Sequence, residues 1–93
     1  MAAGAILEDI GTLLAELEGL GAKETASQYD AAHFGNFYVD VAARKGAFRI
    51  VRDRGQYLLD GDLDRIKTLG YWRAFDSRAE FFVAVLTYAR AVV

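Results

Sequence analysis

The chain has 93 residues, of which 54% are hydrophobic and 26% are charged, and its formal net charge is −2. This composition is typical of one globular domain, residues 1–93, and excludes intrinsic disorder. The absence of cysteine excludes disulfides and thiolate metal sites, and a single histidine excludes a histidine-rich metal centre. A core of this size leaves no room for a deep, enclosed cavity, so we expect no cofactor.

Charge is distributed unevenly along the chain. Residues 1–43 carry a net charge of −6 and residues 44–93 a net charge of +4. The two halves either attract each other in the folded protein or present separate patches to oppositely charged partners. The small overall charge gives no general attraction to nucleic acid, so we expect none as a partner.

The N-terminal sequence lacks the basic segment of a secretory signal. The longest apolar stretch, residues 81–89, has nine residues, whereas a membrane span needs about 20. We therefore expect a cytoplasmic protein that does not contact a membrane.

Residues 3–20 have the pattern of an amphipathic helix. Hydrophobic side chains recur along one face at three- and four-residue spacing; they are Ile6, Ile10, Leu13, Leu14 and Leu17. Gly19 and Gly21 are expected to end the helix, because glycine readily adopts the left-handed conformation found at helix C-termini. Gly11, inside the helix, costs about 1 kcal/mol relative to alanine.

Three short strands are predicted in the middle of the chain. Residues 22–35 show no clear period, and Gly35-Asn36 predicts a turn before the first strand. The predicted strands are residues 37–41, 47–52 and 56–60, with turns at Arg44-Lys45-Gly46 and Asp53-Arg54-Gly55. Short turns between alternating segments indicate a three-stranded antiparallel meander.

Two helices are predicted after the strands. Asp62 can cap a short helix that runs to Leu69 and ends at Gly70. Ser77 and Glu80 form a capping box at the start of a helix that runs to about Val92. The sequence therefore predicts an α+β domain of order α-β-β-β-α-α, with two layers and the long helices packed on one face of the meander.

Alternation along the strands assigns side chains to the two faces of the sheet. The face that packs on the helices is predicted to hold Phe37, Val39, Val41, Phe48 and Ile50. The outward face is predicted to hold Tyr38, Asp40, Arg49 and Val51, joined by Tyr57 or Leu58. The register of the third strand decides between the last two, and the pattern leaves it open.

Asp60, Asp62 and Asp64 have the spacing of the first three ligands of a calcium loop. Such a loop also needs glycine at its sixth position and a bidentate glutamate at its twelfth, where the chain has Arg65 and Tyr71. Aspartates at a helix start also act as caps and interact with the helix dipole. We therefore expect no metal site.

No motif for catalysis is evident. His33 is the single histidine, no nucleophile elbow surrounds a serine, and the glycines form neither a phosphate-binding nor a dinucleotide-binding motif. We expect His33 to be a structural or surface residue and the protein not to be an enzyme. An active site would require a cleft that joins His33 to two carboxylates.

Two further groups have alternative interpretations. Arg49, Arg52 and Arg54 could hold an anion, but Asp40 lies across the predicted hairpin from Arg49, which favours a cross-strand ion pair. Tyr71 and Trp72 join the last two helices. They either plug the core or, with Trp72 exposed, offer a binding anchor.

The outward face of the sheet is the candidate binding surface. With the adjoining turn it comprises Tyr38, Asp40, Arg49, Val51, Arg52, Asp53 and Arg54. Tyrosine and arginine are enriched where proteins bind one another. The alternative is a solvated sheet face without a partner. The acidic flank of the first helix, with Glu8, Asp9 and Glu16, is the second candidate surface.

One segment resembles a known group of proteins. Phe34-Gly35-Asn36 precedes an alternating strand, and Arg52-Asp53-Arg54-Gly55-Gln56 leads into a short apolar strand. Over residues 34–60 the chain resembles small bacterial single-domain proteins with these FGN and RDRGQ segments, some of which are encoded beside polymorphic toxins as immunity proteins. The resemblance implies a non-enzymatic protein that binds and blocks one cognate toxin, and it implies no particular contact residues.

The first functional hypothesis is therefore a protein-binding module that occludes a toxin domain, with complementary charge speeding association. The second is a homo-oligomeric structural or regulatory domain, such as a homodimer paired through edge strands or the sheet face. The third hypothesis is that the protein is an enzyme.

Overall fold

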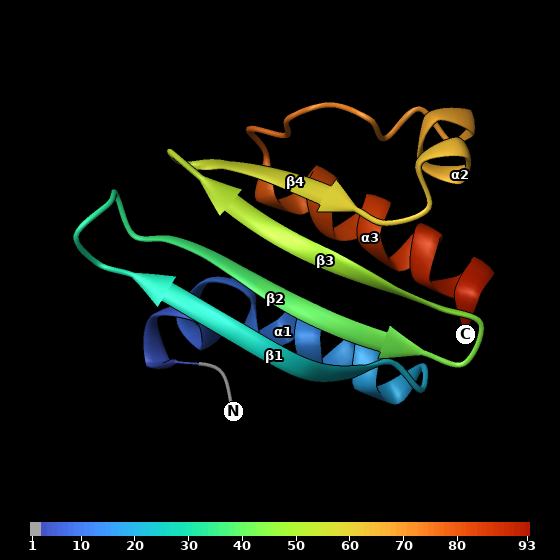
Figure 1. Ribbon diagram of the computed structural model, residues 1–93, viewed down its shortest axis with the longest axis horizontal. Coiled ribbons are helices and arrows are strands. Elements are labelled where there is room, and N and C mark those ends of the chain that lie inside the picture. The colour runs from blue at the N-terminus through green and yellow to red at the C-terminus, as the bar shows by residue number, and fades with distance from the viewer. Residues whose placement is uncertain (1–2) are drawn as a thin grey trace.

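The structure, a computed structural model, describes residues 3–93 as a helix, a four-stranded antiparallel sheet and two further helices (Figure 1). The elements are α1 (Gly4–Gly19), β1 (Lys23–Asp30), β2 (Asn36–Ala43), β3 (Gly46–Asp53), β4 (Gln56–Asp60), α2 (Leu63–Thr68) and α3 (Arg78–Val92). The strands lie in the order β1-β2-β3-β4, so each pairs with its neighbour in sequence. The α+β class, the single domain and the antiparallel meander are as predicted.

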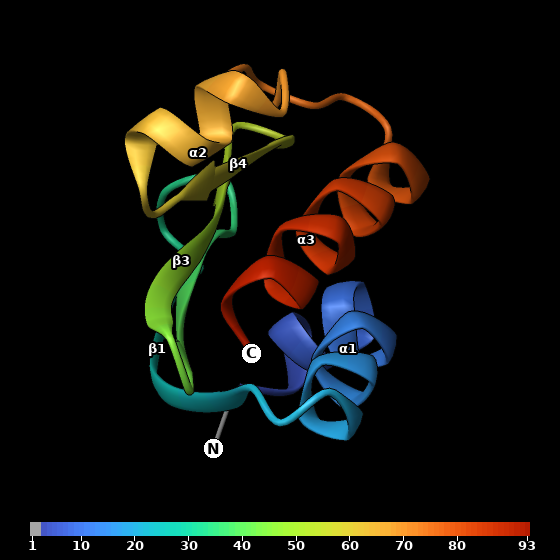
Figure 2. The same cartoon turned by 90° about the vertical axis from the view of Figure 1, so that its right-hand side faces the viewer.

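The helices cover one face of the sheet. Figure 2 shows the long helices α1 and α3 side by side on the same face, and Figure 1 shows α2 beyond the end of β4. All five residues predicted to face the helices are buried, namely Phe37, Val39, Val41, Phe48 and Ile50. They pack with the buried stripe of α1 and with α3 in one core cluster. Among residues 3–93, no helix has the length and apolar character that a membrane crossing requires.

The prediction of three strands is wrong, because residues 23–30 form a fourth strand. β1 pairs antiparallel with β2, and the register shifts between Glu24 and Ala26. The strand lies at the edge of the sheet and carries mainly polar side chains. Since an edge strand with few core contacts needs no hydrophobic alternation, the period-two signal is absent.

The first helix ends as its glycines predict. Leu20 is its last capping residue, and Gly21 follows with φ +92°. The Gly21 N–H donates to the Glu18 carbonyl at 3.0 Å, and the Ala22 N–H donates to the Leu17 carbonyl at 2.9 Å. This pair of bonds is a Schellman motif, which turns the chain directly into β1.

The hairpin turns match the predicted positions. Ala43 pairs with Gly46, and Asp53 pairs with Gln56, so each loop has two residues. Arg54 and Gly55 both have positive φ, +53° and +81°. Two successive left-handed residues make a type I′ turn, whose twist matches that of the flanking strands.

The last two helices begin at the predicted caps. The Asp62 side chain accepts a hydrogen bond from the Arg65 N–H, and the Ser77 hydroxyl oxygen accepts one of 3.2 Å from the Glu80 N–H. The cap of α3 fixes its register, so that Phe81, Val85 and Tyr88 are buried against the sheet.

Candidate protein-binding face of the sheet

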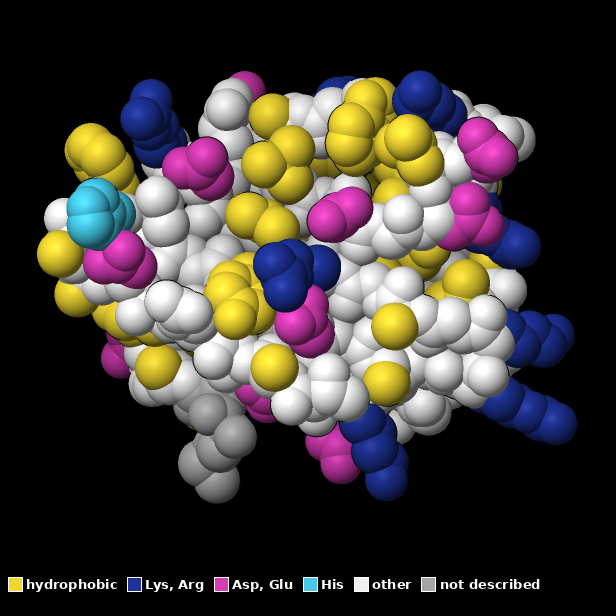
Figure 3. Space-filling model, viewed as in Figure 1, with side chains coloured by type: hydrophobic (Ala, Val, Ile, Leu, Met, Phe, Trp, Pro, Cys, Tyr) yellow, Lys and Arg dark blue, Asp and Glu magenta, His cyan; other side chains and the backbone are white. Residues whose placement is uncertain are grey.

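The face of the sheet turned away from α1 and α3 carries two rows of side chains. Register pairs Tyr38 with Val51 and Val51 with Leu58, which makes an apolar row across β2, β3 and β4. A parallel charged row consists of Asp40, Arg49 and Asp60. We call these six residues the outer face; Figure 3 views the molecule from this side. The register also answers the question left open by the sequence, since Leu58 faces outward and Tyr57 is buried.

Arg49 is held in place at the centre of the outer face. Its Nε donates to Asp40 Oδ1 at 2.7 Å, and its second guanidinium nitrogen donates to Asp40 Oδ2 at 3.1 Å. Its Cζ lies 4.0 Å from the centroid of the Tyr38 ring. The predicted cross-strand ion pair is confirmed, and a cation–π contact adds to it.

The ion pair changes the acidity of both partners. The hydrogen bond from Arg49 lowers the pKa of Asp40 below its ordinary value, although burial opposes the shift. The same hydrogen bond raises the pKa of Arg49. Both groups are therefore charged across the physiological pH range, and the arginine is already oriented before any partner arrives.

The β3–β4 turn extends the outer face at one end. Asp53 and Arg54 are exposed there. The Arg54 N–H donates to Asn36 Oδ1 at 2.8 Å, which ties this turn to the start of β2. The Arg54 guanidinium lies 5.8 Å from the ring centroid of Phe34, a side chain that is 76% exposed. An exposed phenylalanine beside an arginine adds a second aromatic contact point at this end of the sheet.

Arg52 does not belong to the predicted surface. It pairs with Phe37 and Tyr57, so its side chain lies on the helix side of the sheet. There its first guanidinium nitrogen is 3.0 Å from Asp9 Oδ2. The expectation failed because Arg52 is still a strand residue, and strand alternation places it on the same face as Ile50.

Asp9 is the centre of a polar cluster that the sequence reasoning missed. The Tyr57 hydroxyl donates to Asp9 Oδ1 at 2.6 Å, and an Arg78 nitrogen donates to the same oxygen at 3.3 Å. Together with the contact from Arg52, these groups link α1 to β3, β4 and α3. The Asp9 side chain is 10% exposed, so the expected acidic flank of α1 is left with Glu8 and Glu16.

A positional signal for this role was present in the sequence. Asp9 follows Ile6 by three residues and precedes Leu13 by four, which places it at the border of the buried stripe of α1. Burial and the Asp9 contact raise the pKa of Tyr57 to about 12. Because the carboxylate is shared by a tyrosine and two arginines, its evident role is to fasten the helices to the sheet.

The single histidine lies on the exposed β1–β2 turn. His33 Nδ1 is 2.6 Å from Asp30 Oδ2, and the side chain is 71% exposed. Across residues 3–93, no three histidine, cysteine, aspartate or glutamate side chains are grouped to hold a metal ion. Asp62 instead serves as the cap of α2.

The residue that fills the junction between α2 and α3 is Phe75. It is 1% exposed, and it exchanges two backbone hydrogen bonds with Tyr57, of 2.9 and 2.8 Å. Trp72, by contrast, is 55% exposed. Trp72 therefore does not plug the core. Its exposure is what the other interpretation of the Tyr71-Trp72 pair, a binding anchor, requires.

Comparisons of the chain with protein-family models, with curated proteins and with solved structures gave no match.

Proposed function

We propose that this protein is a non-enzymatic protein-binding module, an immunity protein that binds and blocks a cognate bacterial toxin through the outer face of its sheet. The resemblance of residues 34–60 to small bacterial proteins supports the class of partner. The choice of surface rests on one observation. Arg49 is fixed between Asp40 and the Tyr38 ring, at the centre of the sheet face on which α1 and α3 do not pack.

Preorganisation is what makes this group suited to binding. A free arginine loses rotamer freedom when a partner immobilises it, which costs about 0.5–1.5 kcal/mol. Arg49 is already held by two hydrogen bonds and an aromatic ring, so this cost is met in the unbound protein. Tyrosine and arginine at the centre of an interface are the side chains whose loss most often weakens binding.

The dimensions of the molecule are sufficient for a stable complex. A standard interface buries about 800 Å² on each partner. The molecule measures 34 × 25 × 19 Å, and Figure 1 looks onto its broadest side, where the sheet lies in front of α1 and α3. A partner covering most of this side would reach both the apolar row and the β3–β4 turn.

The test is a growth-rescue and binding experiment with the product of the adjacent gene as the candidate toxin. Co-expression of the wild-type chain should restore growth of bacteria that produce this toxin, and the purified proteins should bind. Tyr38→Ala with Arg49→Ala should weaken binding by at least about tenfold, as expected for central tyrosine and arginine residues. The matched control is Val83→Ala with Arg90→Ala, which changes an exposed apolar residue and an exposed arginine on α3.

Loss of binding in both double variants, or in neither, would contradict the choice of the outer face. Failure of the wild-type chain to restore growth would contradict the immunity function itself. The alternative, a homo-oligomeric structural or regulatory domain, predicts a stable dimer by light scattering that becomes a monomer in the Tyr38→Ala, Arg49→Ala variant.

A further inference from the structure

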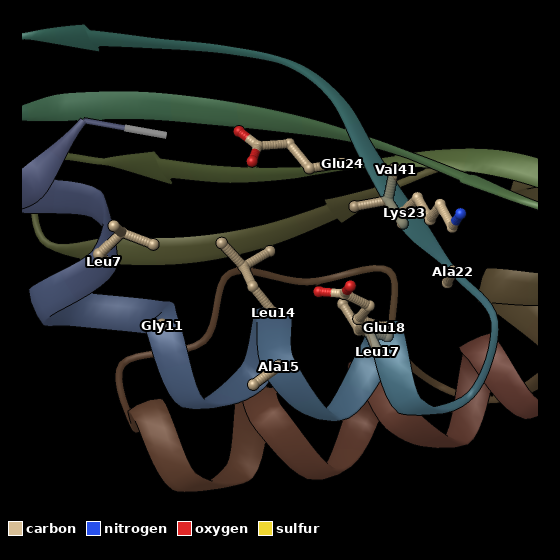
Figure 4. Close-up of a pocket in the computed structure, with 10 residues that line it drawn as sticks. All are labelled: Leu7, Gly11, Leu14, Ala15, Leu17, Glu18, Ala22, Lys23, Glu24 and Val41. Carbon is tan, nitrogen blue, oxygen red and sulfur yellow. The ribbon is translucent and has the colours of Figure 1, made fainter. Parts of the chain in front are cut away.

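A groove between α1 and β1 lies on the opposite side of the sheet from the outer face. It encloses about 430 Å³. The α1 residues Leu7, Gly11, Leu14 and Ala15 line it with apolar or small groups, and Glu18 and Glu24 add carboxylates. In Figure 4 the side chains of Leu7 and Leu14 extend from α1 toward the sheet, and the Glu24 carboxylate extends over the space beside them.

The shape of α1 opens this groove. Ile10 departs from helical geometry, with φ −123° and ψ +16°, so the helix is kinked immediately before Gly11. A Cβ at Gly11 would meet side-chain atoms of Leu7 at 3.7–4.0 Å, which is ordinary contact. The glycine is therefore not required by close packing, and its lack of a side chain leaves the middle of the groove empty.

The groove adjoins an unpaired strand edge. β1 is the first strand of the sheet, and within residues 3–93 no strand pairs with its far side. An edge strand presents a row of unpaired backbone donors and acceptors that a further strand can use. An extended segment added there would place alternate side chains on the helix side, next to the groove.

Charge defines the chemistry of that segment. Glu24 Oε2 is buried, and no described residue donates a hydrogen bond to it. A buried carboxylate oxygen without a donor is costly, and a lysine or arginine from a partner would satisfy it. Glu18 and Lys23 also line the groove, and in Figure 4 the Lys23 amine extends away from the Glu24 carboxylate. Two carboxylates against one amine still favour a basic side chain beside Glu24.

The same charges disfavour a second copy of this chain as the occupant. Lys23 is the single basic residue of β1. The antiparallel register that sets Lys23 of one copy opposite Glu24 of the other would pair only these two residues of each strand, so a second copy cannot supply a basic side chain to Glu24 and also pair along β1.

We propose that β1 and the α1–β1 groove bind an extended peptide segment of another protein, which adds to the edge of the sheet and inserts an apolar and a basic side chain at alternate positions. This surface is separate from the outer face, so the chain has two binding surfaces, one on each side of the sheet. The inference does not depend on the immunity function.

The experiment is a phage-display selection of random 12-residue peptides on the purified chain, followed by affinity measurements on synthetic copies of the enriched peptides. The peptides should carry lysine or arginine two residues from an apolar residue. Glu24→Gln should lower their affinity about tenfold, the size expected for a lost hydrogen bond to a charged group. Gly11→Leu, which fills the groove and improves helix propensity, should abolish binding while the protein stays folded.

Two controls separate this surface from others. Glu16→Gln changes an exposed acid of α1 that does not line the groove, and it should leave affinity unchanged. Tyr38→Ala with Arg49→Ala should also leave peptide affinity unchanged, whatever it does to toxin binding. The proposal is overturned if no peptide is enriched, if the enriched peptides lack basic residues, if Gly11→Leu binds them as well as wild type does, or if the chain proves to be a dimer paired through β1.

Discussion

The Tyr57 hydroxyl and the Asp9 carboxylate form a hydrogen bond of 2.6 Å that joins residues 48 positions apart in the chain. One residue is on β4 and the other on α1, so the bond fastens a helix to the opposite half of the sheet. Tyr57 also stacks on Phe81 of α3, with ring centroids 5.1 Å apart. Its ring thus packs in the core while its hydroxyl is paired.

Tyr57 makes the free energy of unfolding depend on pH in the alkaline range. Its pKa is raised to about 12 in the folded protein, mainly by burial and then by Asp9, against about 10 in an unfolded chain. A raised pKa means that the protonated form is favoured by folding. The contribution of the protonated Tyr57 to the free energy of unfolding is therefore complete below about pH 10, and it is lost as pH rises from about 10 to 12. Urea unfolding across this range should show a smaller decline in the free energy of unfolding for Tyr57→Phe than for wild type. Tyr29→Phe, at an exposed position, should decline as wild type does.

Asp9→Asn should destabilise the protein by about 2 kcal/mol, because it leaves partly buried Arg52 without its charged partner. The free energy of unfolding from chemical denaturation measures this. Glu16→Gln on the exposed side of α1 should change it by less than about 0.5 kcal/mol. Equal effects of the two substitutions would show that the Asp9 cluster does not fasten the helix.

Gly61→Ala should be destabilising by about 1–3 kcal/mol through overpacking. A Cβ at this position would lie 2.7 Å from the Tyr88 hydroxyl and 3.1 Å from Phe48 Cβ. Tyr88 cannot move aside easily, since it is buried and its oxygen accepts a 2.8 Å hydrogen bond from the Asp62 N–H. In a double-mutant cycle with Tyr88→Phe, the cost of Gly61→Ala should shrink, because the nearest clashing atom is gone. Simple additivity of the two changes would refute this cause.

Phe75→Ala and Trp72→Ala should differ sharply in their effect on stability. Truncation of the buried phenylalanine should cost about 3–5 kcal/mol, whereas Trp72, which is 55% exposed, should cost less than about 1 kcal/mol. Thermal or chemical unfolding monitored by circular dichroism distinguishes the two. A large loss at Trp72 would mean that its indole supports the core after all.

Local patterns were enough to predict most of the fold. Hydrophobic spacing predicted α1 and α3, glycines placed the hairpin turns, and the caps at Asp62 and Ser77 placed the starts of α2 and α3. These signals succeed because each depends on residues close together in sequence. On the outer face, strand alternation placed Tyr38, Asp40, Arg49 and Val51 together, as the register confirms.

Features that depend on distant parts of the chain were not predicted. β1 has no alternating hydrophobic pattern, because it lies at the sheet edge and buries none of its side chains in the core. Arg52 and Asp9 are charged residues whose burial depends on each other, although they lie on different elements. The sequence shows each charge separately, and only the packing of α1 against the sheet brings the pair together.

The meander order of the strands has a consequence for folding during synthesis. Because every strand pairs with its sequence neighbour, each hairpin can close as soon as its residues leave the ribosome. The apolar side of β3 and β4 stays exposed until α3, which is made after the sheet, packs against it. In that interval Ile50 and Leu59 are without most of the side chains that bury them in the folded protein. The nascent sheet is therefore the form of this protein most prone to aggregate or to need a chaperone.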